Sequence, residues 1–346
     1  MKTNKNSNRL LGAKALLVLA GFSFAIISCE DDSSPTPQQN VLEIAVSNEN
    51  FDVLEAAAIK AGSGVTNVLG GSGQITVFAP TDAAFVSYLE VANEADAIAA
   101  VNGLTPTAAA DLLTFHVIAG SEIKAAAIAE GTTAVTMARA SNNKAFITKT
   151  SAGVSINNAR VATADVDASN GVIHIIDAVL TPPAGDIIAV ATSTANAPSF
   201  GILASALTKA NLSTTLQGNG PFTVFAPTDD AFLSTLRAVY SDPDLTEAEA
   251  INVINSLTNS SSPLSLTSLT QILLYHVVPT SGYSINLTNN QVLTTAKADA
   301  PNTVTLGIGA SVTVDGLASD PSTVTATNIS ATNGVIHVID KVLLPN

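Results

Sequence analysis

The chain of 346 residues contains one cysteine, Cys29, and no tryptophan. A single cysteine excludes an internal disulfide framework. The absence of tryptophan disfavours carbohydrate recognition by ring stacking, although hydrogen-bonded glycan contacts are still open. No Gly-x-Ser-x-Gly elbow, Walker loop or His-Glu-x-x-His motif occurs, and no nucleophile–base pair recurs along the chain. We therefore predict that the protein is not an enzyme and uses no cofactor.

Basic residues are few, with 14 Lys and Arg against 28 Asp and Glu. Four of the basic residues, Lys2, Lys5, Arg9 and Lys14, precede the first acidic residue, so the chain beyond them has a net charge of −18. Such a surface repels phosphate backbones and anionic lipid headgroups, which argues against nucleic acid as a partner. Because hydrophobic residues make up 47% and charged residues 12%, the chain can still bury substantial cores.

The amino terminus has the pattern of a secretory leader. The basic residues are followed by an apolar stretch of 13 residues, Ala15 to Ile27, which is too short to span a bilayer. The next residues complete Ile26-Ile27-Ser28-Cys29, which resembles a bacterial lipobox, with Ile27 where a small residue is usual. We expect residues 1–28 to be a lipoprotein signal peptide and Cys29 to be lipidated, so that a lipid anchor holds the protein at the membrane.

Residues 29–40 are polar and contain prolines, as expected for a flexible tether. The acidic run Glu30-Asp31-Asp32 resembles the surface-export signal of lipoproteins in the Bacteroidetes lineage. It therefore predicts an outer-membrane lipoprotein on the cell surface. The alternative is a plain solvated spacer on a protein that faces the periplasm.

The rest of the chain repeats itself. The string TVFAPTDAAF at 76–85 returns as TVFAPTDDAF at 223–232, and NGVIHIID at 170–177 returns as NGVIHVID at 333–340. Between these anchors an aromatic-His dipeptide occurs twice, at 115–116 and 275–276. Three motifs in the same order with similar spacing indicate a tandem duplication. We place the first domain at 41–182 and the second at 186–345.

Each repeat begins with helical signals and ends with strand signals. Thr81 is a good helix N-cap with Asp82 in the first turn, Thr105-Pro106 opens a second helix, and Thr246 with Glu249 fits a capping box. Later, from 134 to 180 and from 291 to 344, β-branched residues alternate with turn residues. Helices first and strands later predict an α+β domain.

These ordered motifs resemble the three markers of the fasciclin-like domain, in both repeats. The resemblance covers the chain from about Val41 onward. It implies two domains, each a β-sandwich wedge of two sheets with helices packed along one side. It also implies a role in cell adhesion and attachment to extracellular matrix through weak protein or glycan contacts.

The resemblance also supplies candidate interaction residues. The aromatic-His dipeptide corresponds to Phe115-His116 and Tyr275-His276, and in animal members the Tyr-His segment is implicated in integrin binding. A second adhesive element, an Asp-Ile pair before the Asn-Gly motif, corresponds to Asp165-Val166, whereas the second repeat has Asn328-Ile329. Neither repeat has both elements intact. The resemblance therefore predicts an adhesive module, but not an integrin ligand.

All four histidines lie in the repeated motifs, and no Glu or Cys recurs beside them at metal-ligand spacing. We favour structural roles for them, with metal binding as the less favoured reading, and predict no metal site. The segment 165–171 faintly resembles a calcium loop but lacks the distal glutamate. Asp82 and Asp229 are better explained by helix capping than by catalysis.

Two functions fit these observations. The first is a membrane-anchored surface adhesion module whose partner is an extracellular protein or polysaccharide, and whose two weak sites gain by avidity. The second is carriage of a small apolar ligand, or envelope scaffolding in the periplasm. The second repeat carries an insertion between its first two markers, with the polar loop 259–263, so we expect Tyr275 and this loop to carry any specificity.

Overall fold

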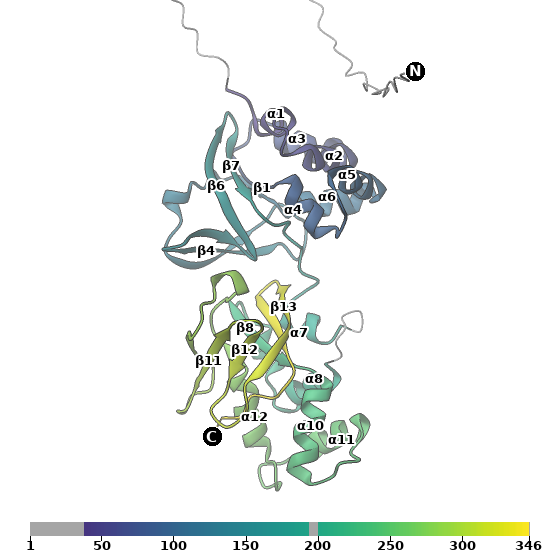
Figure 1. Ribbon diagram of the computed structural model, residues 1–346, viewed down its shortest axis with the longest axis vertical. Helices are drawn as coiled ribbons and strands as arrows, with labels where there is room; N and C mark the ends of the chain where they lie inside the picture. The colour runs from purple at the N-terminus through teal and green to yellow at the C-terminus, as the bar shows by residue number, and fades with distance from the viewer. Residues whose placement is uncertain (1–37, 194–199, 346) are drawn as a thin grey trace, which may run out of the picture. The chain divides into compact units, whose positions relative to one another are not determined.

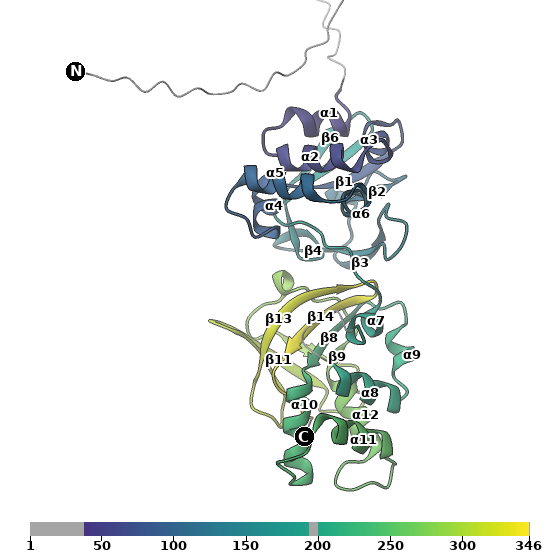
Figure 2. The ribbon, with the colours of Figure 1, turned by 90° about the vertical axis from the view of Figure 1, so that its right-hand side faces the viewer.

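A computed structural model describes residues 38–193 and 200–345, and these described residues form one compact unit. Both sequence repeats fold in the same way, each with its helices before and between the first strands of a seven-stranded sheet (Figures 1 and 2). The strand order is β2-β1-β7-β6-β5-β4-β3 in the first repeat and β9-β8-β14-β13-β12-β11-β10 in the second. The predicted α+β class is confirmed.

The first repeat places its helices before and between its first strands. Its helices are α1 (Val41–Ser47), α2 (Asp52–Ala61), α3 (Ser63–Gly70), α4 (Asp82–Tyr88), α5 (Glu94–Gly103), α6 (Pro106–Thr114) and the 3-10 turn η1 (Ala125–Ala127). Its strands are β1 (Ile75–Pro80), β2 (Val117–Ala119), β3 (Gly131–Thr136), β4 (Lys144–Thr150), β5 (Gly153–Ile156), β6 (Ala159–Ala168) and β7 (Gly171–Ile176).

The second repeat follows the same order. Its helices are α7 (Ile187–Ala191), α8 (Gly201–Lys209), α9 (Ser213–Leu216), α10 (Asp229–Tyr240), α11 (Glu247–Ser256), α12 (Leu266–Tyr275) and the 3-10 turn η2 (Ser284–Asn286). Its strands are β8 (Phe222–Pro227), β9 (Val277–Val278), β10 (Val292–Thr294), β11 (Thr303–Ile308), β12 (Val312–Asp315), β13 (Ser322–Ala331) and β14 (Gly334–Ile339).

The helix boundaries predicted from capping residues are confirmed. Thr81 caps α4 by accepting a hydrogen bond from Ala84 N, and Thr105 does the same for α6 with proline at the first helical position. Thr246 and Glu249 form the capping box of α11. Pro80 is the last residue of β1, because a proline has no N–H to donate within a central strand.

The long strand β6 joins the two halves of the sheet. Its first two residues, Ala159 and Arg160, pair with β5, and the rest of the strand pairs with β7. The register with β7 shifts between Val161 and Thr163 and between Thr163 and Val166. These irregularities are β-bulges, which increase the twist and bend the strand. The two halves therefore form the two sheets of a wedge, and α1, α2 and α3 lie over the β1–β7 half (Figure 1).

Two apolar clusters fill the first repeat. One lies between helices and sheet and includes Phe51, Leu54 and Phe85. The other includes Phe78 and Phe115 with residues of β4, β5 and β7. Each fully buried phenylalanine contributes roughly 1.5–3 kcal/mol by leaving water. The second repeat has a matching pair of clusters.

The centre of each sheet is a parallel strand pair that brings two sequence motifs together. In β1 and β7, Thr76 lies opposite Val172 and Phe78 opposite His174, and β8 pairs with β14 in the same way. Gly171 begins β7 with φ +152°, and a Cβ on it would lie 1.9 Å from the carbonyl oxygen of Ile75. No side chain fits at this position, so the glycine of the Asn-Gly motif is required by the close approach of the two strands.

We predict that Gly171→Ala lowers the free energy of unfolding by about 2–3 kcal/mol or prevents folding, because the two strands must separate to admit the methyl group. Gly64→Ala in α3 is the matched control, since a Cβ there meets nothing within 4 Å and φ is not left-handed. Urea denaturation of both variants measures the difference. Equal stabilities would show that the close approach does not constrain the fold.

Candidate interaction site

The aromatic residues of the predicted interaction motif lie in the protein interior. Phe115 ends α6 and is fully buried, and Tyr275 is the last residue of α12 with 0% of its surface exposed. The Tyr275 hydroxyl donates a hydrogen bond to the Thr303 carbonyl at 2.5 Å. Burial raises the pKa of Tyr275. Neither ring forms part of an exposed surface, so the prediction that Tyr275 carries specificity gains no support from its position.

His116 and His276 each join the end of a helix to the last segment of their repeat. The backbone N–H of Leu180 donates to Nε2 of His116 at 2.9 Å, so the proton lies on Nδ1, which is 2.8 Å from the Leu112 carbonyl. His276 repeats this arrangement with Leu343 and Ile272. Both rings are buried with both nitrogens engaged, which supports a structural role for them.

His174 and His337 hold a loop against the sheet. Nε2 of His174 lies 2.8 Å from the Ile123 carbonyl, and Nε2 of His337 lies 2.8 Å from the Gly282 carbonyl. Their Nδ1 atoms accept from backbone N–H groups of the neighbouring bulged strand, at 3.3 Å and 3.4 Å. Burial lowers the pKa of His337. Each ring also packs against the phenylalanine of the first motif, Phe78 or Phe225.

The second predicted adhesive element, Asp165-Val166, occupies the bulge of β6. Asp165 has φ +59°, and its Oδ1 accepts a hydrogen bond from Ala125 N at 2.8 Å. Asn328 stands at the same place in the second repeat, with φ +62° and a 2.8 Å bond from Ser284 N to its Oδ1. The acceptor oxygen is therefore a structural requirement that either residue meets. Val166 packs against the helix–sheet core, whereas the Asp165 side chain is 36% exposed.

Accessible charges surround this bulge in the first repeat. Lys124 Nζ lies 2.9 Å from Asp167 and 3.5 Å from Glu122, and hydrogen bonding to Asp167 raises the pKa of Lys124. We call Glu122, Lys124, Asp165 and Asp167 the loop–bulge surface. At the equivalent place the second repeat has no such ion pair but a hydrogen bond from the Tyr283 hydroxyl to Ser330 Oγ at 3.1 Å. This difference between the repeats was missed from the sequence, although comparing the residues beside the Asp-Ile position would have found it.

The inserted segment of the second repeat presents a polar loop between α11 and α12. Asn259, Ser260, Ser262 and Pro263 are exposed. Within the loop, Thr258 N donates to Ser261 Oγ at 2.8 Å, and Thr267 Oγ1 donates to Asn259 Oδ1 at 3.0 Å. The loop is thus accessible and internally bonded, and its role in specificity stays a prediction.

The motif aspartates cap a helix that lies far from them in the sequence. Asp82 accepts from Val53 N at 2.8 Å and Asp52 N at 3.3 Å, at the start of α2, where Phe51 offers no side-chain cap. Asp229 does the same for α8 through Gly201 and Ile202. Burial raises the pKa of Asp82, and the two amide hydrogen bonds oppose this. Capping is the observed role, on a helix other than the one that the aspartate begins.

In the part of the chain that the structure describes, no group of three or more His, Cys, Asp or Glu side chains could hold a metal ion. Within residues 38–193 and 200–345, no helix is both long and apolar enough to cross a membrane. Cys29, the predicted lipidation site, lies outside the described residues, as does the whole predicted signal peptide.

The chain is a tandem α+β module. Its two repeats share motifs whose residues form hydrogen bonds inside each repeat. Comparison with known proteins specifies it further. The fasciclin domain model matches residues 50–182 and 198–345. The chain belongs to the fasciclin-domain family.

Relatives in this family come from bacteria and animals. Protein sll1483 of Synechocystis sp. is 38% identical over 143 residues, which cover 41% of this chain and 73% of that protein. Human periostin is 31% identical over 196 residues, 56% of this chain but only 20% of periostin. A solved FAS1 domain pair from the insect cell adhesion molecule fasciclin I covers 88% of this chain and 95% of that chain, with 17% identity and a TM-score of 0.38.

The buried histidines predict how stability depends on pH. Burial lowers the pKa of His116 and of His276 from 6.5 to about 4. The neutral ring therefore stabilises the fold fully above the unfolded-state value of about 6.5, and this contribution is lost as the pH falls toward 4. Below pH 6.5 the unfolded chain takes up a proton on each histidine and the folded chain does not. Each histidine should therefore lower the free energy of unfolding by up to about 1.4 kcal/mol for each unit by which the pH falls in this window.

His276→Gln removes one of these two titrating groups. We expect the stability difference between the natural chain and this variant to shrink steadily from pH 7 to pH 4.5 in urea denaturation. At pH 7 the stability difference reflects the hydrogen bonds that the variant lacks. Its change with pH reflects the protonation of His276 in the natural chain. A difference that is the same at every pH would contradict the assignment of a neutral, buried ring.

Proposed function

We propose that this chain is a lipid-anchored adhesion module on the cell surface, whose partner is an extracellular protein or polysaccharide. The observation that carries the proposal is the presence of two fasciclin domains in one chain, since such domains are found in cell adhesion proteins. The leader that ends at Cys29 supports the lipid anchor, and the acidic residues after it support export to the outer face.

The positions of the motif residues indicate how adhesion would work. Phe115, His116, Tyr275 and His276 are all buried, so these four residues do not offer the contacts to a partner. Two accessible surfaces differ between the repeats: the charged loop–bulge surface of the first and the polar loop 259–263 of the second. Two dissimilar weak sites in one anchored chain would together bind an extended partner by avidity.

A binding role without catalysis is part of the same proposal. Both ring nitrogens of His116 and of His276 are engaged by backbone groups, which leaves neither ring free to act as a general base. The carboxylates of Asp82 and Asp229 are likewise engaged by helix N–H groups. These side chains are therefore not available as a nucleophile–base pair.

The test compares cells that carry the natural chain with cells that lack it, in attachment to protein-coated and polysaccharide-coated surfaces. We expect attachment to depend on the chain and to be lost with Cys29→Ala, because the domains are then no longer held at the membrane. Protease treatment of intact cells, followed by detection of the protein, checks its placement. Protection of the protein from protease would overturn the surface assignment.

A matched variant tests the loop–bulge surface. Asp165→Asn with Asp167→Ser gives the first repeat the residues that the second repeat carries at Asn328 and Ser330, so the fold and the bond to Ala125 N are kept. Loss of one of two linked sites should weaken attachment by at least about tenfold. Replacement of 259–263 by a short glycine-serine loop tests the second surface separately. Full attachment by both variants would exclude these two surfaces.

A further inference from the structure

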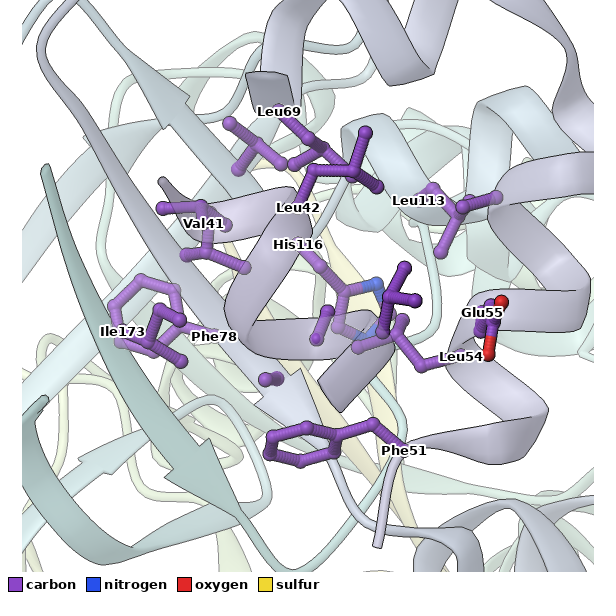
Figure 3. A pocket seen from close by; sticks show the side chains of 16 residues that line it. Val41, Leu42, Phe51, Leu54, Glu55, Leu69, Phe78, Leu113, His116 and Ile173 are labelled. Carbon is purple, nitrogen blue, oxygen red and sulfur yellow. The ribbon is translucent and has the colours of Figure 1, made fainter. Parts of the chain in front are cut away.

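A small apolar cavity lies inside the first repeat, between α1, α2 and the central strands β1 and β7. Its volume is about 30 Å³, and its exposed lining is entirely apolar. Figure 3 shows side chains from all these elements surrounding it, among them Leu42, Leu54 and Ile173. A space of this size holds about two water molecules, but a water would find no hydrogen-bonding partner on these walls. The cavity suits hydrocarbon.

The edge of the cavity is accessible at α1. Val46 belongs to the lining and is 50% exposed, and Leu42 beside it is partly buried. An aliphatic side chain half open to water at the edge of an apolar cavity forms a continuous apolar path from the surface inward. In the second repeat, Thr192 stands at the position of Val46, four residues after Ile188 at the position of Leu42.

Comparison of the repeats identifies a buried lining position at which they differ in side-chain size. The residues around the cavity recur in the second repeat, with Phe200, Leu203 and Leu216 in place of Phe51, Leu54 and Leu69. Besides Val46 and Glu55, a buried lining residue differs: Ala58, which is 3% exposed, corresponds to Leu207 of α8, which is 4% exposed. A leucine is three carbon atoms larger than an alanine, so a leucine in place of Ala58 would occupy part of the cavity. The fold therefore tolerates a leucine at this position.

The charges at the cavity select the ligand further. Glu55 is the one carboxylate of the lining, and it lies at the edge of the space in Figure 3. The other ionisable residue of the lining, His116, is held neutral by burial that lowers its pKa to about 4. In the second repeat, Ala204 replaces Glu55. A carboxylate at the edge repels an anionic headgroup, so a fatty acid is disfavoured.

We propose that the first repeat binds the hydrocarbon end of a single-chain, uncharged amphiphile, such as a fatty alcohol or a monoacylglycerol. The terminal carbons enter the cavity beneath α1, the following carbons lie along Leu42 and Val46, and the polar head stays in water beside Glu55. This site goes beyond the proposed adhesion and does not depend on it, because neither the cavity nor its edge includes the loop–bulge surface or the loop 259–263.

The test is a titration of the purified full chain with n-decanol in detergent-free buffer, followed by calorimetry and by NMR contacts to the terminal methyl group of the alcohol. We expect binding in the first repeat, with contacts from that methyl group to Leu54 and Leu69. Decanoate should bind at least about tenfold more weakly than decanol, and Glu55→Gln should reduce this difference. Equal binding of decanol and decanoate to the natural chain would overturn the selection by Glu55.

Ala58→Leu closes the cavity with the residue that the second repeat carries, and it should weaken decanol binding at least about tenfold. Ile59→Thr is the control, because Ile59 is 68% exposed on the same helix, does not line the cavity and corresponds to Thr208. If Ala58→Leu fails to fold, Ala58→Val serves with the same expectation. Undiminished binding by a folded Ala58 variant, or a loss caused by Ile59→Thr alone, would show that the alcohol binds elsewhere.

Discussion

One buried asparagine in each repeat fixes the segments on which the rest of the fold depends. Oδ1 of Asn170 accepts from Val41 N, where α1 begins, and Nδ2 donates to the carbonyls of Leu69 and Gly71, where α3 ends. Asn333 makes the same three bonds to Ile187, Leu216 and Gly218. Buried backbone groups at helix ends need partners, and this side chain satisfies three of them at the start of the central strand β7 or β14. The positions of the helices on the sheet follow from it.

The motifs that the two repeats share serve this framework, and the repeats differ outside these motifs. The asparagine, the glycine after it, the capping aspartates and the histidines all bond to backbone groups of their own repeat. Where the first repeat has the exposed ion pair of Lys124 and Asp167, the second has a hydrogen bond from the buried Tyr283 hydroxyl to Ser330 Oγ. A duplicated framework of this kind can carry two different binding surfaces without two different folds.

Local features of the fold could be predicted from the sequence, because they depend on neighbouring residues. The caps at Thr81, Thr105 and Thr246 and the early helices with later strands are of this kind. Long-range features could not be predicted: Asp82 caps a helix about 30 residues earlier, and Asp165 anchors a loop 40 residues away. Ala58 lines the cavity because α2 packs against the central strands, and its correspondence to Leu207 is recognised only when the two repeats are seen to fold alike.

The hydrogen bonds of Asn170 also bear on how the protein ages chemically. An asparagine followed by glycine is prone to deamidation, because the unhindered backbone nitrogen of the glycine attacks the side-chain carbonyl and closes a succinimide ring. In the folded chain that side chain is buried and held by three hydrogen bonds, which prevent the rotation that ring closure requires. Isoaspartate at Asn170 or Asn333 would therefore form from unfolded chains, and peptide mapping of stored protein would record how often each repeat had opened.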